Sequence, residues 1–123
     1  MLLGMTYIHE KGLCNRDFKL ENMLVDADFC TIKIADFGFA AETRGRNNDG
    51  VRDTYLGTAG YMAPEILESL PYNGRAVDSY ALGVILFAMV AQRMPFAAVN
   101  KEQLGGRKLY DMDPHFRDFI LDK

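Results

Sequence analysis

The sequence predicts a mainly α-helical fold with one small β-hairpin. The strongest helical signal covers residues 75–91, where apolar side chains recur at the spacing of one helix face. Residues 1–12 have the pattern of a helix end that stops at Gly12. Residues 23–25 and 31–34 have the pattern of two short strands on either side of a polar turn, which predicts a hairpin.

The first helix is the earliest predicted element. The chain begins inside it, and we therefore expect further sequence upstream. After the hairpin, residues 41–53 are polar and contain two glycines, which predicts a mobile loop. Residues 65–70 predict a short helix that stops before Pro71, because the residue before a proline avoids the helical conformation.

The helix predicted at 75–91 supplies the main apolar face of the chain. Its apolar positions at helical spacing are Val77, Tyr80, Ala81, Val84, Ile85 and Ala88. A weaker helix is predicted at 99–110, and a last helix from Asp113 onward. The apolar face of that last helix consists of Phe116, Phe119 and Ile120.

Composition narrows the class of protein. The chain has 123 residues, a net charge of −3 and a sequence pI near 5.3, which argues against nucleic acid as the main partner. No signal peptide is recognisable, and the apolar run 80–91 is shorter than the roughly 20 residues that span a bilayer. Cys14 and Cys30 form no metal-binding pattern, so we expect free, buried or half-buried thiols, a cytoplasmic location and no membrane.

The chemically richest stretch is residues 15–22, which put an acid, a lysine and an amide on one short loop. Two more blocks follow, Asp36-Phe37-Gly38 and then Ala63-Pro64-Glu65. Taken alone, Asp17 could be a capping residue and Asp36 a turn residue. The predicted hairpin lies between Asn22 and Asp36, so both side chains are expected at the same edge of it.

This order of blocks resembles the eukaryotic protein kinases. The resemblance extends over nearly the whole chain but only to the large, C-terminal lobe, so that 1–123 would be a partial kinase domain whose small lobe is missing. Lys19 and the segment 57–65 favour serine/threonine kinases, of the calcium/calmodulin-dependent type, over tyrosine kinases. The implied reaction is transfer of the γ-phosphoryl group of ATP to a hydroxyl group of a protein substrate.

The resemblance also implies site residues. Asp17 would orient the substrate hydroxyl, Lys19 would neutralise charge on the transferred phosphoryl group, and the Thr58 hydroxyl would bridge the two. Asn22 and Asp36 would hold Mg²⁺. The expected ATP-binding residues are Lys19, Glu21, Asn22, Leu24 and Asp36.

Thr54 has two interpretations. It stands where many such kinases carry an activating phosphate, and an upstream kinase would then be a partner. A phosphate there would add roughly −2 charge and pair with Arg16, which would order the loop. Without modification it is an ordinary loop threonine.

Other polar residues have structural explanations. Asp78 is expected to accept hydrogen bonds from the backbone of the loop 15–22, the alternative being a helix N-terminal acid favoured by the dipole. Glu65 would need a buried arginine partner, and no segment matches one. We interpret Lys33 as a solvent-facing strand residue, and His9 and His115 as surface imidazoles.

The sequence departs from the resemblance at several positions. Asn15 replaces a histidine, Phe18 a leucine and Leu20 a proline. No G-x-G-x-x-G loop and no V-A-I-K strand occur in the 123 residues, so we expect the chain alone to be inactive, with an uncovered apolar face on the 23–35 hairpin. The alternative function is a non-catalytic, kinase-derived binding module, which predicts decay at Asp17, Asn22 or Asp36.

Overall fold

The computed structural model describes residues 1–96. In chain order the elements are α1 (Leu2–Glu10), β1 (Leu13–Cys14), the 3-10 turn η1 (Leu20–Asn22), β2 (Met23–Val25), β3 (Ile32–Ile34), β4 (Ala41–Glu42), α2 (Pro64–Leu67) and α3 (Gly74–Ala91). The helices expected at 99–110 and from Asp113, as well as His115, lie outside the described residues. Within them, the predicted combination of helices with a small hairpin is confirmed.

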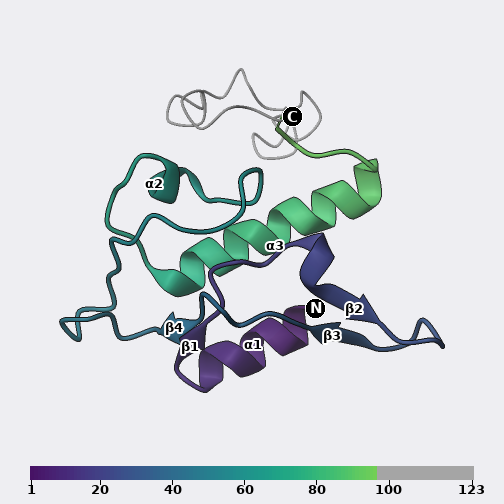
Figure 1. Ribbon diagram of the computed structural model, residues 1–123, viewed down its shortest axis with the longest axis horizontal. Helices are drawn as coiled ribbons and strands as arrows, with labels where there is room; N and C mark the ends of the chain where they lie inside the picture. Colours follow the sequence, from purple (N-terminus) through teal and green to yellow (C-terminus); the bar gives the residue numbers. More distant parts are fainter. Residues whose placement is uncertain (97–123) are drawn as a thin grey trace, which may run out of the picture.

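Helix α3 crosses the middle of the molecule, with α1 and both small sheets on one side and α2 on the other (Figure 1). It begins where the Asn73 side chain accepts hydrogen bonds from the backbone amides of Arg75 and Ala76, at 2.9 and 3.3 Å. It ends at Gln92, which has a left-handed backbone with φ of 54°. The prediction of a helix at 75–91 is therefore confirmed to within one residue.

The buried face of α3 joins two clusters of apolar side chains. One cluster consists of Met5, Ile8, Phe18, Tyr61, Ala81, Val84, Ile85 and Phe96. The other consists of Met62, Ala63, Ile66, Leu67, Tyr72 and Val77. Because residues from the first helix, the loop 15–22 and the segment 57–67 all meet α3, this helix sets their relative positions.

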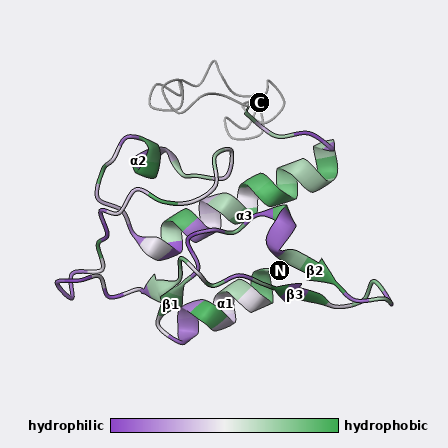
Figure 2. Ribbon diagram, in the orientation of Figure 1, coloured by the Kyte–Doolittle hydropathy of each residue, from purple (hydrophilic) through white to green (hydrophobic). Residues whose placement is uncertain are grey.

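Among residues 1–96, α3 is the one helix that could cross a membrane by length and mean hydropathy, a test that the core helix of a soluble protein also passes. The apolar run 80–91, which we considered too short to span a bilayer, is part of an 18-residue helix that reaches the necessary length. Its packing identifies it as a core helix, since Asp78 and Ile85 are both fully buried against other elements. Figure 2 shows the hydrophobic character of most of α3.

The two sheets are small and antiparallel. Strands β2 and β3 form the predicted hairpin, with Met23 opposite Ile34. The Ala35 amide donates to the Asn22 carbonyl at 2.8 Å, so that Asn22 and Asp36 adjoin at the same edge, as expected. The β1–β4 pair was not predicted.

Two predicted boundaries need correction. The segment 41–53 is not a loop throughout, because residues 41–42 form β4 and Arg52 pairs with Tyr72 in an isolated bridge. The helix expected at 65–70 covers Pro64–Leu67 instead. Proline is well suited to the first turn of a helix, and the positive φ of Ser69, 56°, ends helical geometry two residues later.

An apolar surface is exposed on the β2–β3 hairpin, as predicted. Leu24, Val25 and Ile32 are each at least 40% exposed, and Phe29 at the tip is 85% exposed. Figure 2 shows the hydrophobic colouring of both strands. Among residues 1–96, no element covers this part of the hairpin.

Candidate functional site

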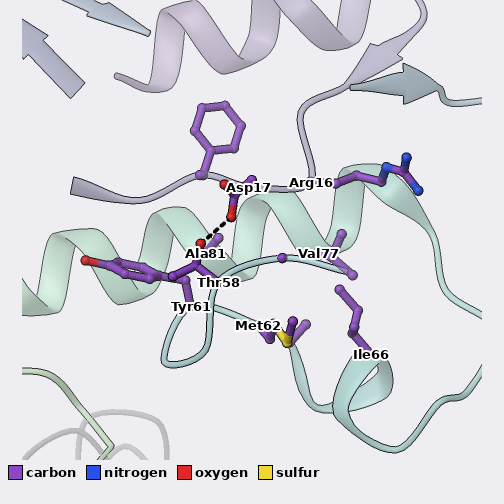
Figure 3. A pocket seen from close by; sticks show the side chains of 11 residues that line it. Arg16, Asp17, Thr58, Tyr61, Met62, Ile66, Val77 and Ala81 are labelled. Atoms are coloured by element: carbon purple, nitrogen blue, oxygen red, sulfur yellow. Dashed lines mark hydrogen bonds between the residues drawn. The ribbon is translucent and has the colours of Figure 1, made fainter. Parts of the chain in front are cut away.

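Three side chains from two distant segments form a closed set of polar contacts. The Thr58 hydroxyl donates to Asp17 Oδ1 at 2.6 Å, and Lys19 Nζ donates to Thr58 Oγ1 at 3.0 Å. Lys19 Nζ also lies 3.0 Å from Asp17 Oδ2. The structure therefore contains the bridging threonine that the sequence analysis expected, and Figure 3 shows the Thr58–Asp17 bond.

The electrostatics of this set favour a charged lysine. The hydrogen bond from Lys19 to Asp17 raises the pKa of Lys19 above its usual value, and the negative charges of Asp17, Glu21 and Asp36 act in the same direction. Partial desolvation opposes this effect but is the smaller influence. Lys19 therefore carries a positive charge at neutral pH, close to the carboxylates of Asp17 and Glu21 in its own loop and to that of Asp36 beyond the hairpin.

A residue of α3 binds the backbone of the loop 15–22. Asp78, which is fully buried, accepts the amide of Asn15 at 2.9 Å and the amide of Arg16 at 2.7 Å, one on each carboxylate oxygen. This confirms the role expected for Asp78. Arg16 has a positive φ of 67°, uncommon for a long side chain, and the two bonds from Asp78 hold the backbone there.

His9 also contacts Asp78, which corrects its interpretation as a surface imidazole. Its Nε2 atom lies 2.8 Å from Asp78 Oδ2, and its side chain is only 13% exposed. The two residues are 69 positions apart, so no local pattern could have shown the contact. Cys30 needs a smaller correction, because it is exposed, whereas Cys14 is buried.

The buried side chain of Asn15 links the loop to the turn that carries Asp36. Asn15 Oδ1 accepts the Asp17 amide at 3.0 Å, and Asn15 Nδ2 donates to the Asp36 carbonyl at 3.1 Å. Asn22, buried at 9% exposure, donates from Nδ2 to the Asp17 carbonyl at 3.3 Å. Side-chain amides thus fix the spacing between the two acidic segments.

Asp36 itself is exposed. Its backbone is left-handed, with φ of 60°, and its Oδ1 accepts the Gly38 amide at 2.9 Å. Its second carboxylate oxygen and the amide oxygen of Asn22 are oxygen ligands of the kind that Mg²⁺ prefers. Because Asn22 Nδ2 is committed to Asp17, its Oδ1 is the atom left to act as a ligand.

These donors fit a magnesium ion that takes its remaining ligands from phosphate and water. Within residues 1–96 no group of three or more His, Cys, Asp or Glu side chains is arranged as a metal site. The residues present therefore match a metal bound together with a phosphate ligand better than an all-protein metal cage.

A cavity of about 10 Å³ lies beneath Asp17, between the loop 15–22 and the segment 57–66. Figure 3 shows Thr58, Tyr61, Met62 and Ile66 around it. It is lined almost entirely by apolar atoms and is about the size of one water molecule. The cavity is therefore a packing gap behind the polar set, too small for an organic ligand.

The Tyr72 side chain connects Thr54 to Arg16. The Tyr72 hydroxyl donates to the Thr54 carbonyl at 2.9 Å and accepts from Arg16 Nη1 at 3.2 Å. Arg16 Nε donates to the Phe39 carbonyl at 2.8 Å. Arg16 therefore faces the segment in which the phosphorylation site was expected.

Other expected site residues are less well integrated. Glu21 is exposed, and its carboxylate accepts only a long hydrogen bond, 3.4 Å, from the Tyr61 hydroxyl. Leu24 is 55% exposed on β2, and Lys33 faces solvent opposite it, as expected. Glu65 is half-buried and forms no ion pair within the described part of the chain.

Comparison with known proteins gives a consistent result. A family model described as protein kinase domain matches residues 1–118. The chain is 42% identical over 104 residues to CBL-interacting protein kinase 28 of Oryza sativa subsp. japonica, covering 85% of this chain and 24% of that protein. It is 40% identical over 111 residues to CBL-interacting serine/threonine-protein kinase 17 of Arabidopsis thaliana, covering 90% and 25%.

A third relative is the serine/threonine-protein kinase GIN4 of Saccharomyces cerevisiae, which is 45% identical over 97 residues. That alignment covers 78% of this chain and 8% of the yeast protein. In these three comparisons the aligned part spans a quarter or less of the length of the relative.

Proposed function

The chain belongs to the protein kinase family, and we propose that it carries the phosphoryl-transfer site of a serine/threonine kinase. The observation that carries this proposal is the set formed by Asp17, Lys19 and Thr58, with contacts of 2.6 to 3.0 Å. The relatives named as serine/threonine kinases support serine and threonine hydroxyls as the groups that receive the phosphoryl group.

In this proposal each residue has a distinct task. Asp17 orients the acceptor hydroxyl and takes its proton, and Thr58 fixes the rotamer of Asp17 by donating to it. Lys19 lies where its charge stabilises the transferred phosphoryl group. Asn22 and Asp36 hold Mg²⁺, which when bound neutralises charge on the phosphates of ATP.

Glu21 and Leu24 complete the proposed site at its exposed side. Leu24 belongs to the uncovered apolar surface of the hairpin and would contact the nucleotide. Glu21 contributes negative charge close to Lys19. We further propose that residues 1–123 correspond to the large lobe of the kinase domain, of the calcium/calmodulin-dependent type, and act in the cytoplasm, away from nucleic acid and membrane surfaces.

The chain alone is proposed to be inactive, because a small lobe with a Gly-rich loop and an ATP-pairing lysine is needed for transfer. Purified residues 1–123 should show little or no phosphoryl transfer. A turnover above about 1 per second, the low end for kinases, would contradict this. An immunoblot of the native cells against residues 41–53 should show a band well above 13.9 kDa.

We propose Thr54 as the site at which an upstream kinase acts. The Arg16 guanidinium, which reaches the Thr54 segment through Tyr72, would pair with the phosphate. Thr54→Ala in the full-length protein should lower activity. This proposal would be contradicted if Thr54→Ala were as active as the wild-type protein after both had been incubated with an extract of the native cells.

The reaction itself is tested with the full-length protein, γ-labelled ATP and Mg²⁺. Label should be recovered as phosphoserine or phosphothreonine in an added protein substrate. Recovery of phosphotyrosine alone would contradict the proposed acceptor. Binding of kinases or substrates with no transfer of label would favour the non-catalytic binding module instead.

A further inference from the structure

Tyr72 is a buried residue outside the proposed site, in the connection between α2 and α3. Its backbone is fixed by the bridge to Arg52. The Arg52 amide donates to the Tyr72 carbonyl at 2.8 Å, and the Tyr72 amide donates to the Arg52 carbonyl at 2.7 Å. Its ring, only 4% exposed, packs in the apolar cluster that includes Met62 and Val77. Backbone and ring together therefore determine where the hydroxyl group lies.

The Tyr72 hydroxyl is used both as a donor and as an acceptor. It donates its proton to the Thr54 carbonyl at 2.9 Å and accepts a hydrogen bond from Arg16 Nη1 at 3.2 Å. A phenol has one proton to donate, so its donor capacity is fully used. Thr54 lies 18 positions and Arg16 lies 56 positions from Tyr72 in the sequence. One hydroxyl group thus joins three separate segments.

Arg16 extends this connection to a fourth segment. Its Nε atom donates to the Phe39 carbonyl at 2.8 Å, in the turn that also carries Asp36. The guanidinium therefore lies between the turn 36–39 on one side and the Tyr72 hydroxyl on the other. Through these contacts the Thr54 segment is attached to the acidic turn although Thr54 carries no phosphate.

The Thr54 segment leads directly to the residue that contacts Asp17. Thr58 follows Thr54 by four positions, and its hydroxyl donates to Asp17 at 2.6 Å. On the other side of Thr58, its carbonyl accepts the amide of the buried Tyr61 at 3.1 Å. The stretch that presents Thr58 is therefore held at Thr54 by Tyr72 and at its far end by the turn to Tyr61.

We propose that Tyr72 is a positioning residue whose hydroxyl holds the Thr54 segment on Arg16 while Thr54 is unphosphorylated. A phosphate on Thr54 would bind the same guanidinium by charge-assisted hydrogen bonds, which are stronger than those of a neutral hydroxyl. The hydroxyl should therefore matter most before phosphorylation, and the unmodified protein should keep a basal activity that depends on it. This inference rests on the proposed kinase function, but the contact can be measured separately from activity.

Tyr72→Phe tests the hydroxyl, because it keeps the buried ring and removes only the oxygen. Tyr7→Phe is the matched control, since it removes the same group from a ring that is 61% exposed on α1. Both variants and the wild type are made as full-length proteins in two forms. In one form Thr54 is kept free of phosphate with a phosphatase, and in the other phosphothreonine is incorporated at position 54 during translation.

Peptide phosphorylation provides the first readout. In the unphosphorylated form, Tyr72→Phe should lower kcat/KM for the peptide about tenfold, with KM for ATP nearly unchanged, because two hydrogen bonds of a buried hydroxyl are lost. In the phosphothreonine form the loss should be less than about threefold, because the phosphate then holds Arg16. Tyr7→Phe should match the wild type in both forms. Full activity of unphosphorylated Tyr72→Phe, or an equal loss in both forms, would overturn the proposal.

Hydrogen exchange of the unphosphorylated full-length protein provides a second readout that needs no activity. The Arg52 amide should exchange about tenfold faster in Tyr72→Phe than in Tyr7→Phe or the wild type. If Tyr72→Phe fails to fold, Arg16→Met decides the result, because it removes the donor to the hydroxyl and should also speed exchange at Arg52. A wild-type protein without transfer activity would contradict the proposed function alone, whereas unchanged exchange at Arg52 in the deciding variant would contradict the inference alone.

Discussion

The loop 15–22 and the turn 36–39 both carry an acid proposed to act in phosphoryl transfer, yet the protein holds them very differently. Asp17 is 7% exposed, and its carboxylate contacts Thr58 and Lys19. Asp36 is exposed, and its carboxylate accepts one backbone amide from Gly38, two residues away. The acceptor side of the site is thus preorganised by long-range contacts, whereas the proposed metal side is left open for ligands that come with the nucleotide.

Of the substitutions that test this difference between the two acids, Asp36→Asn in the full-length kinase should have the largest effect on activity. Loss of the carboxylate should lower kcat by about a hundredfold or more, because metal neutralisation of charge is worth several kcal/mol. The fold should be retained, since Asp36 is exposed. Titration of activity against Mg²⁺ should show a raised requirement. If the magnesium dependence of Asp36→Asn were the same as that of the wild-type protein, the proposal that Asp36 holds Mg²⁺ would be contradicted.

Asp78→Ala should instead damage the fold. It removes the buried acceptor of two loop amides and of His9, and breaking such a buried set costs about 3–5 kcal/mol. The free energy of opening of residues 13–18, measured by hydrogen exchange, should fall accordingly. The matched substitution Asp36→Ala should leave the opening free energy of that segment almost unchanged. Equal losses in both variants would show that the two regions are held alike.

Two glycines provide a smaller, steric version of the same comparison. A Cβ atom on Gly74 would lie 2.3 Å from the buried Cys14 sulfur, behind the loop 15–22. Gly74→Ala should therefore destabilise the protein by about 1–3 kcal/mol, although alanine is the better helix former. A Cβ atom on Gly38 would meet only the exposed Asp36 carboxylate, at 3.1 Å, which can move aside.

For that reason Gly38→Ala should change stability by less than about 0.5 kcal/mol. Urea unfolding of both full-length variants measures the difference. A greater loss of stability in Gly38→Ala than in Gly74→Ala would contradict the packing described behind the loop.

A modest effect on stability is expected from Thr58→Val. It removes one hydroxyl from the Asp17 contacts and should cost about 1 kcal/mol of stability. Thr58→Ser, which retains the hydroxyl, is the control. Activity should fall in the valine variant and recover in the serine variant. Full activity of Thr58→Val would show that Asp17 does not depend on the bridge.

Much of this arrangement could be predicted from the sequence, because it depends on local periodicity. The helical spacing at 75–91 and the two short strand patterns of the hairpin are short-range patterns, and both elements are present. The β1–β4 pair could not be found in this way. Two residues are too few to show alternation, and their partners are 27 to 29 positions apart.

The candidate site shows the same limit. The bridge of Thr58 to Asp17 was expected only because the resemblance to kinases supplied it, since 41 positions separate the two residues. The contact between His9 and Asp78 had no such guide, and a histidine in an otherwise ordinary helix end gives no signal of burial. Contacts between distant segments become visible only when α1 and α3 are packed together.

The most direct test of the account is a comparison of wild-type protein with Asp17→Asn, both full-length, in transfer of labelled phosphate from Mg-ATP to a serine/threonine peptide. Asparagine keeps the size of the side chain but cannot take the hydroxyl proton, so we predict a loss of about a hundredfold to ten-thousandfold in kcat with the fold retained. Equal transfer by the two proteins would contradict the assignment of Asp17, and the absence of transfer by the wild-type protein would contradict the proposed function itself.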